Sequence, residues 1–404
     1  SSGCGLHFVG GVWDLGVDSG GFVIDSMALR KLAVTVLGVL AYSAALELPG
    51  ERDLSNYGYK DYVREFGKHI NDEDRGLRES IFNRHLNIIR NHNLDPLKTW
   101  FMTVNEFTDW SNEEFRATRT NSRPHPPQDF LSAARLGDTA MADLPTSVDW
   151  RTKPGVVTEQ KNQLMCGGCW AYSAVETLES HLALATGKPA PKLSTQQLIS
   201  CTPNPRHCGG TGGCEGATQL LAFNYTEGAG ITTETAYPFM GRTGKCEPSK
   251  IEPVAKISGF TLLPSNNYTA LMNAVATKGP ISISVAAGGM GWQFYGGGIM
   301  KPGPFNKGYT IDHAVQLVGY GEENGIMYWL VRNSWGRWGE KGYIRIKRFG
   351  EGKEPCGMDR RPQDGMACEG DTKPVKYCGL CGILSQSSYP TGLEPVSNDA
   401  SVVV

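Results

Sequence analysis

The chain has 404 residues, a formal net charge of −2, 50 glycines and 11 cysteines. A nearly neutral chain offers no electrostatic basis for binding nucleic acid or an acidic membrane surface, and this length suffices for two or three domains. All cysteines except Cys4 lie between Cys166 and Cys381, which indicates disulfides in an exported protein and metal or redox sites in a cytosolic one.

The segment that begins at Met27 indicates export. Two basic residues precede an apolar stretch, 32–41, and small residues follow it. This is the three-part pattern of a secretory signal, and the stretch is short for a membrane span. We therefore expect a signal peptide over 27–46, with a buried core helix as the alternative. Residues 1–26 are Gly-rich without periodicity, and we expect them to be a non-native or upstream extension.

Residues 55–116 form a distinct region of the chain. They are charged, contain no cysteine and repeat apolar residues at helical spacing, as in Phe82, Leu86 and Ile89. The Pro-rich stretch 119–130 that follows is typical of an exposed linker, open to proteolysis. These patterns predict a helical segment ahead of the cysteine-rich part.

The cysteine-rich part changes from helical to strand patterns along its length. Apolar residues share one helical face from Cys169 to about Ala185, and residues 195–225 indicate further helix. From Gly279 onward, alternation and β-branched runs predict strands. The run Gly296–Gly298 is expected to be a turn. A helical half followed by a β half is an α+β layout.

One set of side chains has the chemistry of a thiol nucleophile. Cys169 stands where the helix should begin, and a thiolate there is stabilised by the helix dipole and by unpaired amides. A nucleophilic cysteine also needs a base and a group that orients the base. His313 lies in one predicted strand and Asn333 ends the next, so adjacent strands would place them side by side. A lone strand histidine is otherwise a core residue.

These residues carry a family resemblance. From about Ser55 to Pro390 the chain resembles the papain-like cysteine proteases of the cathepsin L type with their propeptide. The family signature C-G-[SA]-C-[WY] reads CGGCW here, with Gly168 in place of Ser or Ala, and the histidine and asparagine follow at the family's spacing. The resemblance implies a papain-like two-domain fold, in which a cleft separates a helical domain from a β-barrel-like domain.

The resemblance also implies a role for each candidate catalytic residue. Cys169 would attack the peptide and form a thioester acyl-enzyme. His313 would pair with the thiolate and protonate the leaving amine, while Asn333 orients the imidazole and Trp335 shields their contact. Gln163 would complete the oxyanion hole beside the Cys169 N–H.

The region before the linker resembles the family's propeptide. Two family motifs match with three departures, at Asp74, His85 and Thr103. The matched positions are Asp74, Arg78, Phe82, His85, Ile89 and Asn93 in the first motif, and Thr103, Asn105, Phe107 and Asp109 in the second. We expect an inhibitory propeptide over 47–143 that blocks Cys169, and a free-standing helical domain of other purpose is the alternative. Acid should weaken its contacts by protonating carboxylates such as Asp74 and Asp109.

The mature peptidase is then expected over 144–392, with cleavage near Ala142 to Leu144, an insertion over about 350–377 and a tail over 393–404. By resemblance, Gly216 and Ala217 would pair with an extended substrate, and Ala217 replaces the commoner glycine. A polar pocket for the second substrate residue is implied, with a tolerance for polar or basic side chains. Its residues would be Gln219, Ser284, Ile311, Ala314 and Gln386.

The cysteines depart from the family pattern. The resemblance implies two disulfides, Cys166–Cys214 and Cys201–Cys246, and leaves Cys169 reduced. The remaining five are Cys208, Cys356, Cys368, Cys378 and Cys381. We expect two disulfides among them, at least one within Cys356–Cys381. Cys208 is the expected leftover, with a bond between Cys208 and the insertion as the alternative.

Three other functions are open at this point. The two C-x₂-C pairs, at Cys166 and Cys378, could together bind zinc. A catalytically silent homologue, or a propeptide-type inhibitor that binds a protease, is a second possibility. A thiol–disulfide oxidoreductase lacks the expected βαβ pattern here.

The working hypothesis is a monomeric endopeptidase without cofactor or metal. Its partners would be peptide and protein substrates and its own propeptide. The signal segment and two N-glycosylation triplets, at Asn224 and Asn267, favour the secretory pathway, with a lysosome, a vacuole or the extracellular space as destination.

Overall fold

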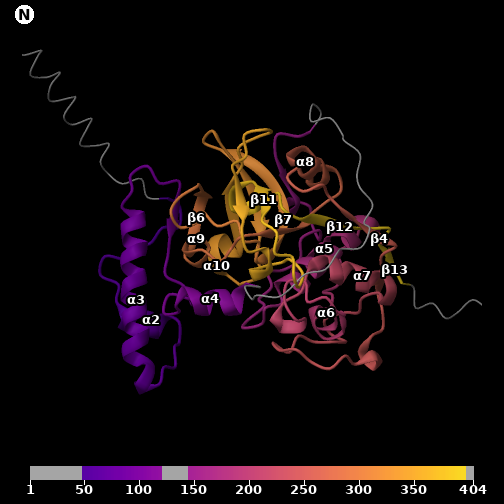
Figure 1. Ribbon diagram of the computed structural model, residues 1–404, viewed down its shortest axis with the longest axis horizontal. Helices are drawn as coiled ribbons and strands as arrows, with labels where there is room; N and C mark the ends of the chain where they lie inside the picture. The colour runs from indigo at the N-terminus through magenta and orange to yellow at the C-terminus, as the bar shows by residue number, and fades with distance from the viewer. Residues whose placement is uncertain (1–47, 121–143, 397–404) are drawn as a thin grey trace, which may run out of the picture. The chain divides into compact units, whose positions relative to one another are not determined.

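The computed structural model describes residues 48–120 and 144–396 (Figure 1). The expected extension 1–26, the signal peptide 27–46 and most of the Pro-rich linker lie outside the described residues. Within the described ranges, the helices are too short or too polar to cross a lipid bilayer.

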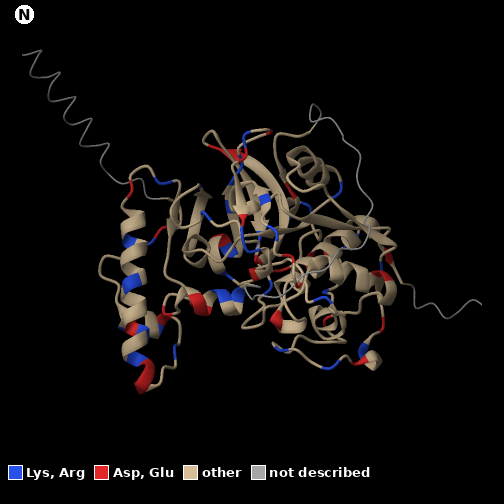
Figure 2. Ribbon diagram, viewed as in Figure 1, with Lys and Arg blue, Asp and Glu red and all other residues tan. Residues whose placement is uncertain are grey.

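The segment before the linker is helical, as predicted. It contains α2 (Tyr59–Glu65), α3 (Asp72–Asn93), the short strand β1 (Trp100–Met102) and α4 (Asn112–Arg119). The apolar side chains of α3 that face inward are buried, among them Phe82, Leu86 and Ile89. Figure 2 shows acidic residues at the start of α4 and basic residues at its end, which complements the helix dipole. Ser111 caps α4, with its hydroxyl accepting from the Glu114 N–H at 3.1 Å.

The first half of the cysteine-rich part is built around one buried helix. α5 (Cys169–Thr186) packs against α6 (Thr195–Cys201) and α7 (Gln219–Ala229) on one side and against β7 on the other. It ends at Gly187, whose left-handed backbone (φ 67°) suits glycine. Ser194 and Thr218 cap α6 and α7 through their hydroxyls. The helix predicted from Cys169 is confirmed, and the helical stretch 195–225 is split by a loop.

The second half is a mostly antiparallel sheet, so the α+β prediction is confirmed. Its strands run in the order β1-β6-β9-β8-β7-β5-β12-β4, and β2 pairs with β7. β7 is central and pairs with β5 and β8. The sheet strands after β1 are β2 (Val148–Asp149), β4 (Gly259–Leu262), β5 (Ile281–Val285), β6 (Tyr295–Met300), β7 (His313–Glu323), β8 (Ile326–Arg332), β9 (Tyr343–Lys347) and β12 (Ser387–Thr391).

Shorter elements complete the chain. The helices are α8 (Tyr268–Thr277), α9 (Met290–Gln293), α10 (Trp338–Lys341) and the 3₁₀ turns η2 (Trp150–Thr152), η3 (Gly213–Glu215), η4 (Pro248–Lys250), η5 (Pro362–Asp364) and η6 (Leu380–Gly382). β3 (Ala255–Lys256) pairs with β13 (Glu394–Pro395). The expected tail over 393–404 is therefore wrong at its start, because β13 belongs to the folded body.

The expected turn at Gly296–Gly298 is also wrong, because these glycines lie inside β6. β6 pairs antiparallel with β1, with Phe101 opposite Gly297. A Cβ on Gly296 would lie 2.4 Å from the Phe101 ring, and a Cβ on Gly298 (φ 87°) would lie 2.4 Å from the Thr99 carbonyl oxygen. The run of glycines thus lets β1 of the N-terminal segment approach β6 closely enough to pair with it at the edge of the sheet.

The insertion forms a small hairpin of its own. β10 (Cys356–Asp359) pairs with β11 (Val375–Cys378), and Cys356 lies directly opposite Cys378. A disulfide joins these two cysteines. The local cross-link predicted for this polar loop is confirmed.

The other disulfides locate the remaining cysteines. Cys166–Cys214 and Cys201–Cys246, the two bonds implied by resemblance, are present. A fourth disulfide joins Cys208 to Cys368, so the expectation that Cys208 is left over is wrong. The insertion reaches back to the segment after α6, where the Gly209 N–H donates to the Ala367 carbonyl at 2.9 Å. The cysteine left over is Cys381, which is buried.

Non-reducing peptide mapping tests this cysteine pattern. We expect linked peptides for Cys208–Cys368 and Cys356–Cys378, with Cys381 recovered as an alkylated thiol only after denaturation, because its side chain is buried. A disulfide that contains Cys381 would contradict the structure.

Candidate active site

Cys169 is the first residue of α5, at the boundary between the two halves. The disulfide Cys166–Cys214 and the bond from the Gly167 N–H to the Cys214 carbonyl (2.9 Å) fix the chain just before it. A Cβ on Gly168 would lie 3.1 Å from the Ile199 side chain and 3.2 Å from the Cys166 sulfur. This tight space explains why glycine suits the position at which the family signature has Ser or Ala.

His313 and Asn333 are brought together by neighbouring strands. His313 opens β7 and Asn333 directly follows β8, and these strands pair antiparallel. The His313 Nε2–H donates to Asn333 Oδ1 at 2.8 Å, and the Ser334 N–H donates to the same oxygen at 2.8 Å. Among the described residues, His313 Nδ1 has no hydrogen-bond partner. One ring nitrogen is thus held while the other is left for proton transfer.

Trp335 covers this pair and connects it to Gln163. Its ring stacks on the His313 ring with centroids 4.7 Å apart, and it is 1% exposed. The Trp335 Nε1–H donates to Gln163 Oε1 at 3.2 Å, and the Ser334 hydroxyl donates to the same atom at 2.7 Å. The Gln163 amide nitrogen is thereby turned the other way, where it donates to the Cys166 carbonyl at 2.9 Å.

Burial keeps the thiol and the imidazole neutral in this form of the protein. Desolvation raises the pKa of the Cys169 thiol to about 12, against a smaller lowering by the Ala314 N–H. Desolvation likewise lowers the pKa of His313 to about 4; the bond to Asn333 opposes this shift and the Arg119 guanidinium adds to it. A thiolate–imidazolium pair therefore requires that water reach the site.

The N-terminal segment buries this site and excludes water from it, mainly through residues at the end of α4. Arg119 is 3% exposed, and its guanidinium donates to the Leu164 carbonyl at 2.5 Å. The Arg119 carbonyl lies 3.5 Å from Gln163 Nε2 and accepts from it. Phe107 and Phe115 pack edge-on against Trp335 at 6.1 and 5.2 Å between ring centroids. Both rings and the arginine belong to the segment that resembles a propeptide.

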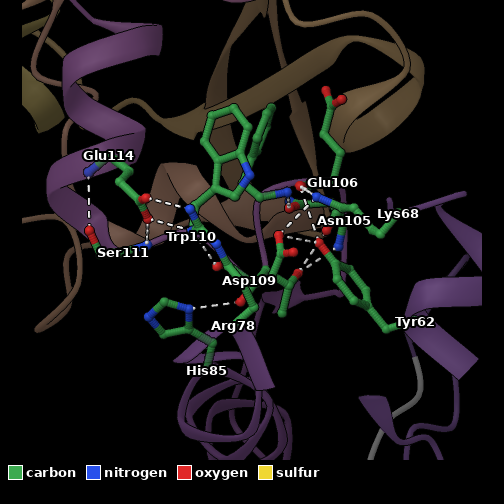
Figure 3. Close-up of polar contacts among 12 residues, drawn as sticks. Tyr62, Lys68, Arg78, His85, Asn105, Glu106, Asp109, Trp110, Ser111 and Glu114 are labelled. Carbon is green, nitrogen blue, oxygen red and sulfur yellow. Dashed lines mark hydrogen bonds and ion pairs between the residues drawn. The ribbon is translucent and has the colours of Figure 1, made fainter. Parts of the chain in front are cut away.

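A polar network braces this segment internally (Figure 3). Arg78 forms a two-pronged ion pair with Glu114 at 2.7 and 2.8 Å and also donates to the Asp109 carbonyl at 3.0 Å. Asp109 is buried and accepts from Tyr62 and Lys68, both at 2.8 Å.

The other motif positions contribute hydrogen bonds to backbone groups. His85 Nδ1 bonds the Thr108 carbonyl at 3.0 Å, and the Asn93 amide exchanges hydrogen bonds with the backbone of Met102. Asn105 donates to the Gln293 carbonyl at 2.7 Å and so ties the segment to the cysteine-rich part. Thr103 does the same through its backbone N–H, which donates to Phe294. Asp74 is exposed at the start of α3, so its motif position contributes little to this bracing.

The expected pocket residues form one cluster. The Gln219 amide donates to the Ser284 hydroxyl at 2.9 Å and to Gln386 Oε1 at 3.4 Å. Ser284 lies opposite Ala314 across β5 and β7. Gln219 Oε1 is buried without a hydrogen-bond partner among the described residues. Ile311 is almost fully buried nearby, two residues before His313.

Gly216 and Ala217 are buried beside the start of α7. The Gly216 carbonyl accepts from the Gly212 N–H at 2.7 Å, so it bonds within its own turn. Gly216 has a positive φ of 98°, whereas Ala217 does not have a positive φ. An alanine at 217 therefore causes no backbone strain, and substrate pairing at these two residues stays a prediction.

The cysteine pattern rules out the zinc alternative. Cys166 and Cys378 each belong to a disulfide with a cysteine outside the proposed ligand set. A disulfide sulfur is not a thiolate ligand, so the two C-x₂-C pairs cannot form a four-cysteine site.

Comparison with known proteins gives the family. Residues 144–366 match the papain family cysteine protease model, and residues 59–115 match the cathepsin propeptide inhibitor domain (I29). The chain belongs to the papain family of cysteine proteases. It combines the family's peptidase domain with its inhibitory propeptide domain, and it is therefore a cysteine endopeptidase made as a zymogen.

Relatives and solved structures agree along most of the chain. It is 36% identical to senescence-specific cysteine protease SAG39 of Oryza sativa subsp. indica, over 89% of this chain and 94% of that protein. It is 34% identical to SAG12 of Arabidopsis thaliana, over 90% of this chain and 100% of that protein. A recombinant stem bromelain precursor is 32% identical, with a TM-score of 0.66 over 82% of this chain and 97% of that chain. The procathepsin L2 proteinase of Tenebrio molitor is 30% identical, with a TM-score of 0.67 over 82% and 98%.

The sequence does not identify two contributors to this papain-family site. Ser334 holds Gln163 and Asn333, and its position right after Asn333 is the available signal. Arg119 reaches the Leu164 carbonyl, but it lies at the start of the stretch predicted to be an exposed linker. Cys381, expected to form a disulfide, is instead a thiol that accepts from Trp292 Nε1 at 3.4 Å.

The ion pair between Arg78 and Glu114 predicts acid weakening of the propeptide. Arg78 lowers the pKa of Glu114 below its value in the unfolded chain. Such a group stabilises the fold above its unfolded pKa of about 4.3, and this contribution is lost as the pH falls through the folded pKa. In the Cys169→Ser zymogen, Glu114→Gln should cost at most about 1 kcal/mol at pH 6–7, because the pair is partly exposed. The difference should vanish near pH 3.

Urea unfolding or limited proteolysis of the propeptide across pH 3–7 measures this effect. Glu79→Gln is the matched control, because Glu79 is exposed in the middle of α3. The same pH dependence in Glu114→Gln and in the parent would contradict the assignment.

Proposed function

We propose that Cys169 is the nucleophile of this peptidase, with His313 as the acid–base group and Asn333 as the positioning residue. The observation that carries the proposal is the hydrogen bond from His313 Nε2 to Asn333 Oδ1, which leaves His313 Nδ1 without a partner among the described residues. The next strand residue, Ala314, directs its backbone N–H at the Cys169 sulfur. This is the arrangement that nucleophile, base and orienting group need.

The chemistry follows from these positions. His313 Nδ1 takes the thiol proton, and the sulfur attacks the scissile carbonyl carbon. The oxyanion is stabilised by the Gln163 amide and the Cys169 N–H, once the Arg119 carbonyl has left Gln163. His313 returns the proton to the leaving amine, which breaks the C–N bond and leaves a thioester. Water, deprotonated by His313, then hydrolyses the thioester and regenerates the thiol.

Activation then consists of removing the propeptide, which exposes Cys169 and His313 to water. With the propeptide in place, both groups of the pair are buried and neutral. When Arg119 and the phenylalanines leave, water and the helix N-terminus favour the thiolate, and the loss of a nearby guanidinium favours the imidazolium. We assign 47–143 to the propeptide and the residues from 144 through β13 to the mature enzyme, which we expect to act as a monomer on peptide and protein substrates.

The secretory pathway is the proposed location, with a lysosome, a vacuole or the extracellular space as the end point. Four disulfides support it, because such bonds persist in oxidising compartments. The exposed Asn224 of one glycosylation triplet agrees with it.

The substrate pocket is proposed to accept polar side chains. Gln219, Ser284 and Gln386 present amide and hydroxyl groups, and within the described residues the buried Gln219 Oε1 has no hydrogen-bond donor. A purely aliphatic side chain would leave this oxygen unpaired, at a cost of about 1–3 kcal/mol.

Substitutions of the three candidate catalytic residues test the proposal. Cys169→Ser should fold but lose peptidase activity by a factor on the order of 10⁴ or more, and His313→Ala should be similarly impaired. Asn333→Ala should lose less, because it removes orientation and not the proton carrier. kcat/KM on a fluorogenic peptide is the measurement, with exposed Lys376→Gln as the control. Full activity of Cys169→Ser would refute the assignment.

Maturation should follow acidification. Incubation near pH 4–5 should yield a new N-terminus close to Ala142 to Leu144, and peptidase activity should appear together with it. N-terminal sequencing over the time course measures this. An intact chain that is already fully active would contradict the proposed zymogen mechanism.

A further inference from the structure

The insertion spans from the strand that carries His313 to the helical half. The Met366 N–H donates to the Ile311 carbonyl at 2.6 Å, two residues before His313. At Gly365 a Cβ would lie 2.0 Å from the same carbonyl oxygen, so glycine permits this approach. The insertion thus lies directly against Ile311, one of the expected pocket residues.

Its middle is then fixed to the segment after α6. The disulfide Cys208–Cys368 makes the covalent link. The Glu369 N–H donates to the Arg206 carbonyl at 3.2 Å, and the Glu369 carboxylate pairs with His207 at 2.5 Å. Residues 365–369 of the insertion are thus fixed at both ends, and they form a wall that is rigid enough to shape a binding site.

A cavity of about 720 Å³ lies behind this wall. Gln386 and Ile311 line it from the body of the peptidase, and both also belong to the proposed substrate pocket. The remaining lining comes almost entirely from the insertion. The cavity therefore continues the pocket beyond Gln386.

The lining has an apolar stem and an acidic end. Ile311, Pro362 and Met366 provide apolar surface, and Asp359 and Asp371 provide carboxylates. In the described part of the chain neither aspartate forms an ion pair: Asp359 accepts from Thr310 and the Arg361 N–H, and Asp371 accepts from the Cys368 N–H. Among the described residues that line the cavity, the exposed Lys373 is the only cationic one.

Gln219, which is hydrogen-bonded to the lining residue Gln386, supplies a further acceptor. Gln219 Oε1 is fully buried and has no hydrogen-bond partner among the described residues, while its amide nitrogen points to Ser284 and Gln386. A group that donates hydrogen bonds, carries positive charge and has a long apolar stem would satisfy all three features. Lysine and arginine side chains have this composition.

We propose that the insertion builds a side-chain pocket that binds a lysine or arginine of the substrate, at the second residue before the scissile bond. The stem would pack between Ile311 and Met366, and the charged head would lie near Asp371 and Asp359. This inference rests on the proposed peptidase function. It gives the insertion a role in selecting substrates.

Matched peptides test the pocket on the acid-matured enzyme. Two fluorogenic peptides should differ only at the second residue before the scissile bond, lysine in one and norleucine in the other. Active-site titration with an epoxide inhibitor corrects each preparation for its content of folded enzyme. The readout is the ratio of kcat/KM for the lysine peptide to that for the norleucine peptide.

Asp371→Asn should lower this ratio about fivefold to tenfold, with kcat/KM for the norleucine peptide unchanged, because only the charge is removed. Lys373→Gln should raise the ratio, because it removes the opposing charge from the same lining. Lys376→Gln, exposed on β11 and outside the lining, should leave the ratio unchanged.

Two results would overturn the inference. In the first, Asp371→Asn and Lys373→Gln leave the ratio as it is in the parent while the norleucine peptide is cleaved, so that the pocket is refuted and the peptidase function stands. In the second, the matured parent cleaves neither peptide although Cys169 is titrated, which refutes the proposed function as well.

Discussion

The folded precursor must bury the thiol of Cys169 and the imidazole of His313 together, where the helical half meets the β half. Cys169 must start a helix and His313 must start a strand, and both must be dry while the propeptide is attached. A dry site holds both groups neutral, because charging either one without water is costly. The same burial that stabilises the folded precursor therefore keeps it inactive.

The propeptide provides that burial through a few anchors. β1 pairs with the glycine-rich β6 at one edge of the sheet, and Arg119 reaches the loop before Cys166 at the other end of the segment. Between them, Phe107 and Phe115 pack on the indole of Trp335. Cys169 is placed by α5, and His313 and Asn333 are placed by the paired strands β7 and β8. We therefore expect removal of the segment to change the solvation of these residues more than their geometry.

Local patterns predicted the parts of this site that local physics determines. The helix from Cys169 and the strand from His313 are readable because apolar periodicity and β-branched runs act over a few residues. The strand at Gly296–Gly298 was not predictable, because the Phe101 ring that leaves no room for a Cβ there comes from a distant segment of the chain. The partner of Cys208 was missed for the same reason, because the insertion meets it only after tertiary folding.

We infer that burial by the propeptide controls the ionisation of Cys169. The most direct measurement is the rate of Cys169 alkylation by iodoacetamide between pH 4 and 9, before and after acid maturation, with the labelled peptide identified so that Cys381 is not counted. We expect slow labelling of the zymogen, rising only at alkaline pH, and fast labelling of the mature enzyme from weakly acidic pH upward. Equal rates in the two forms at pH 5–7 would contradict it.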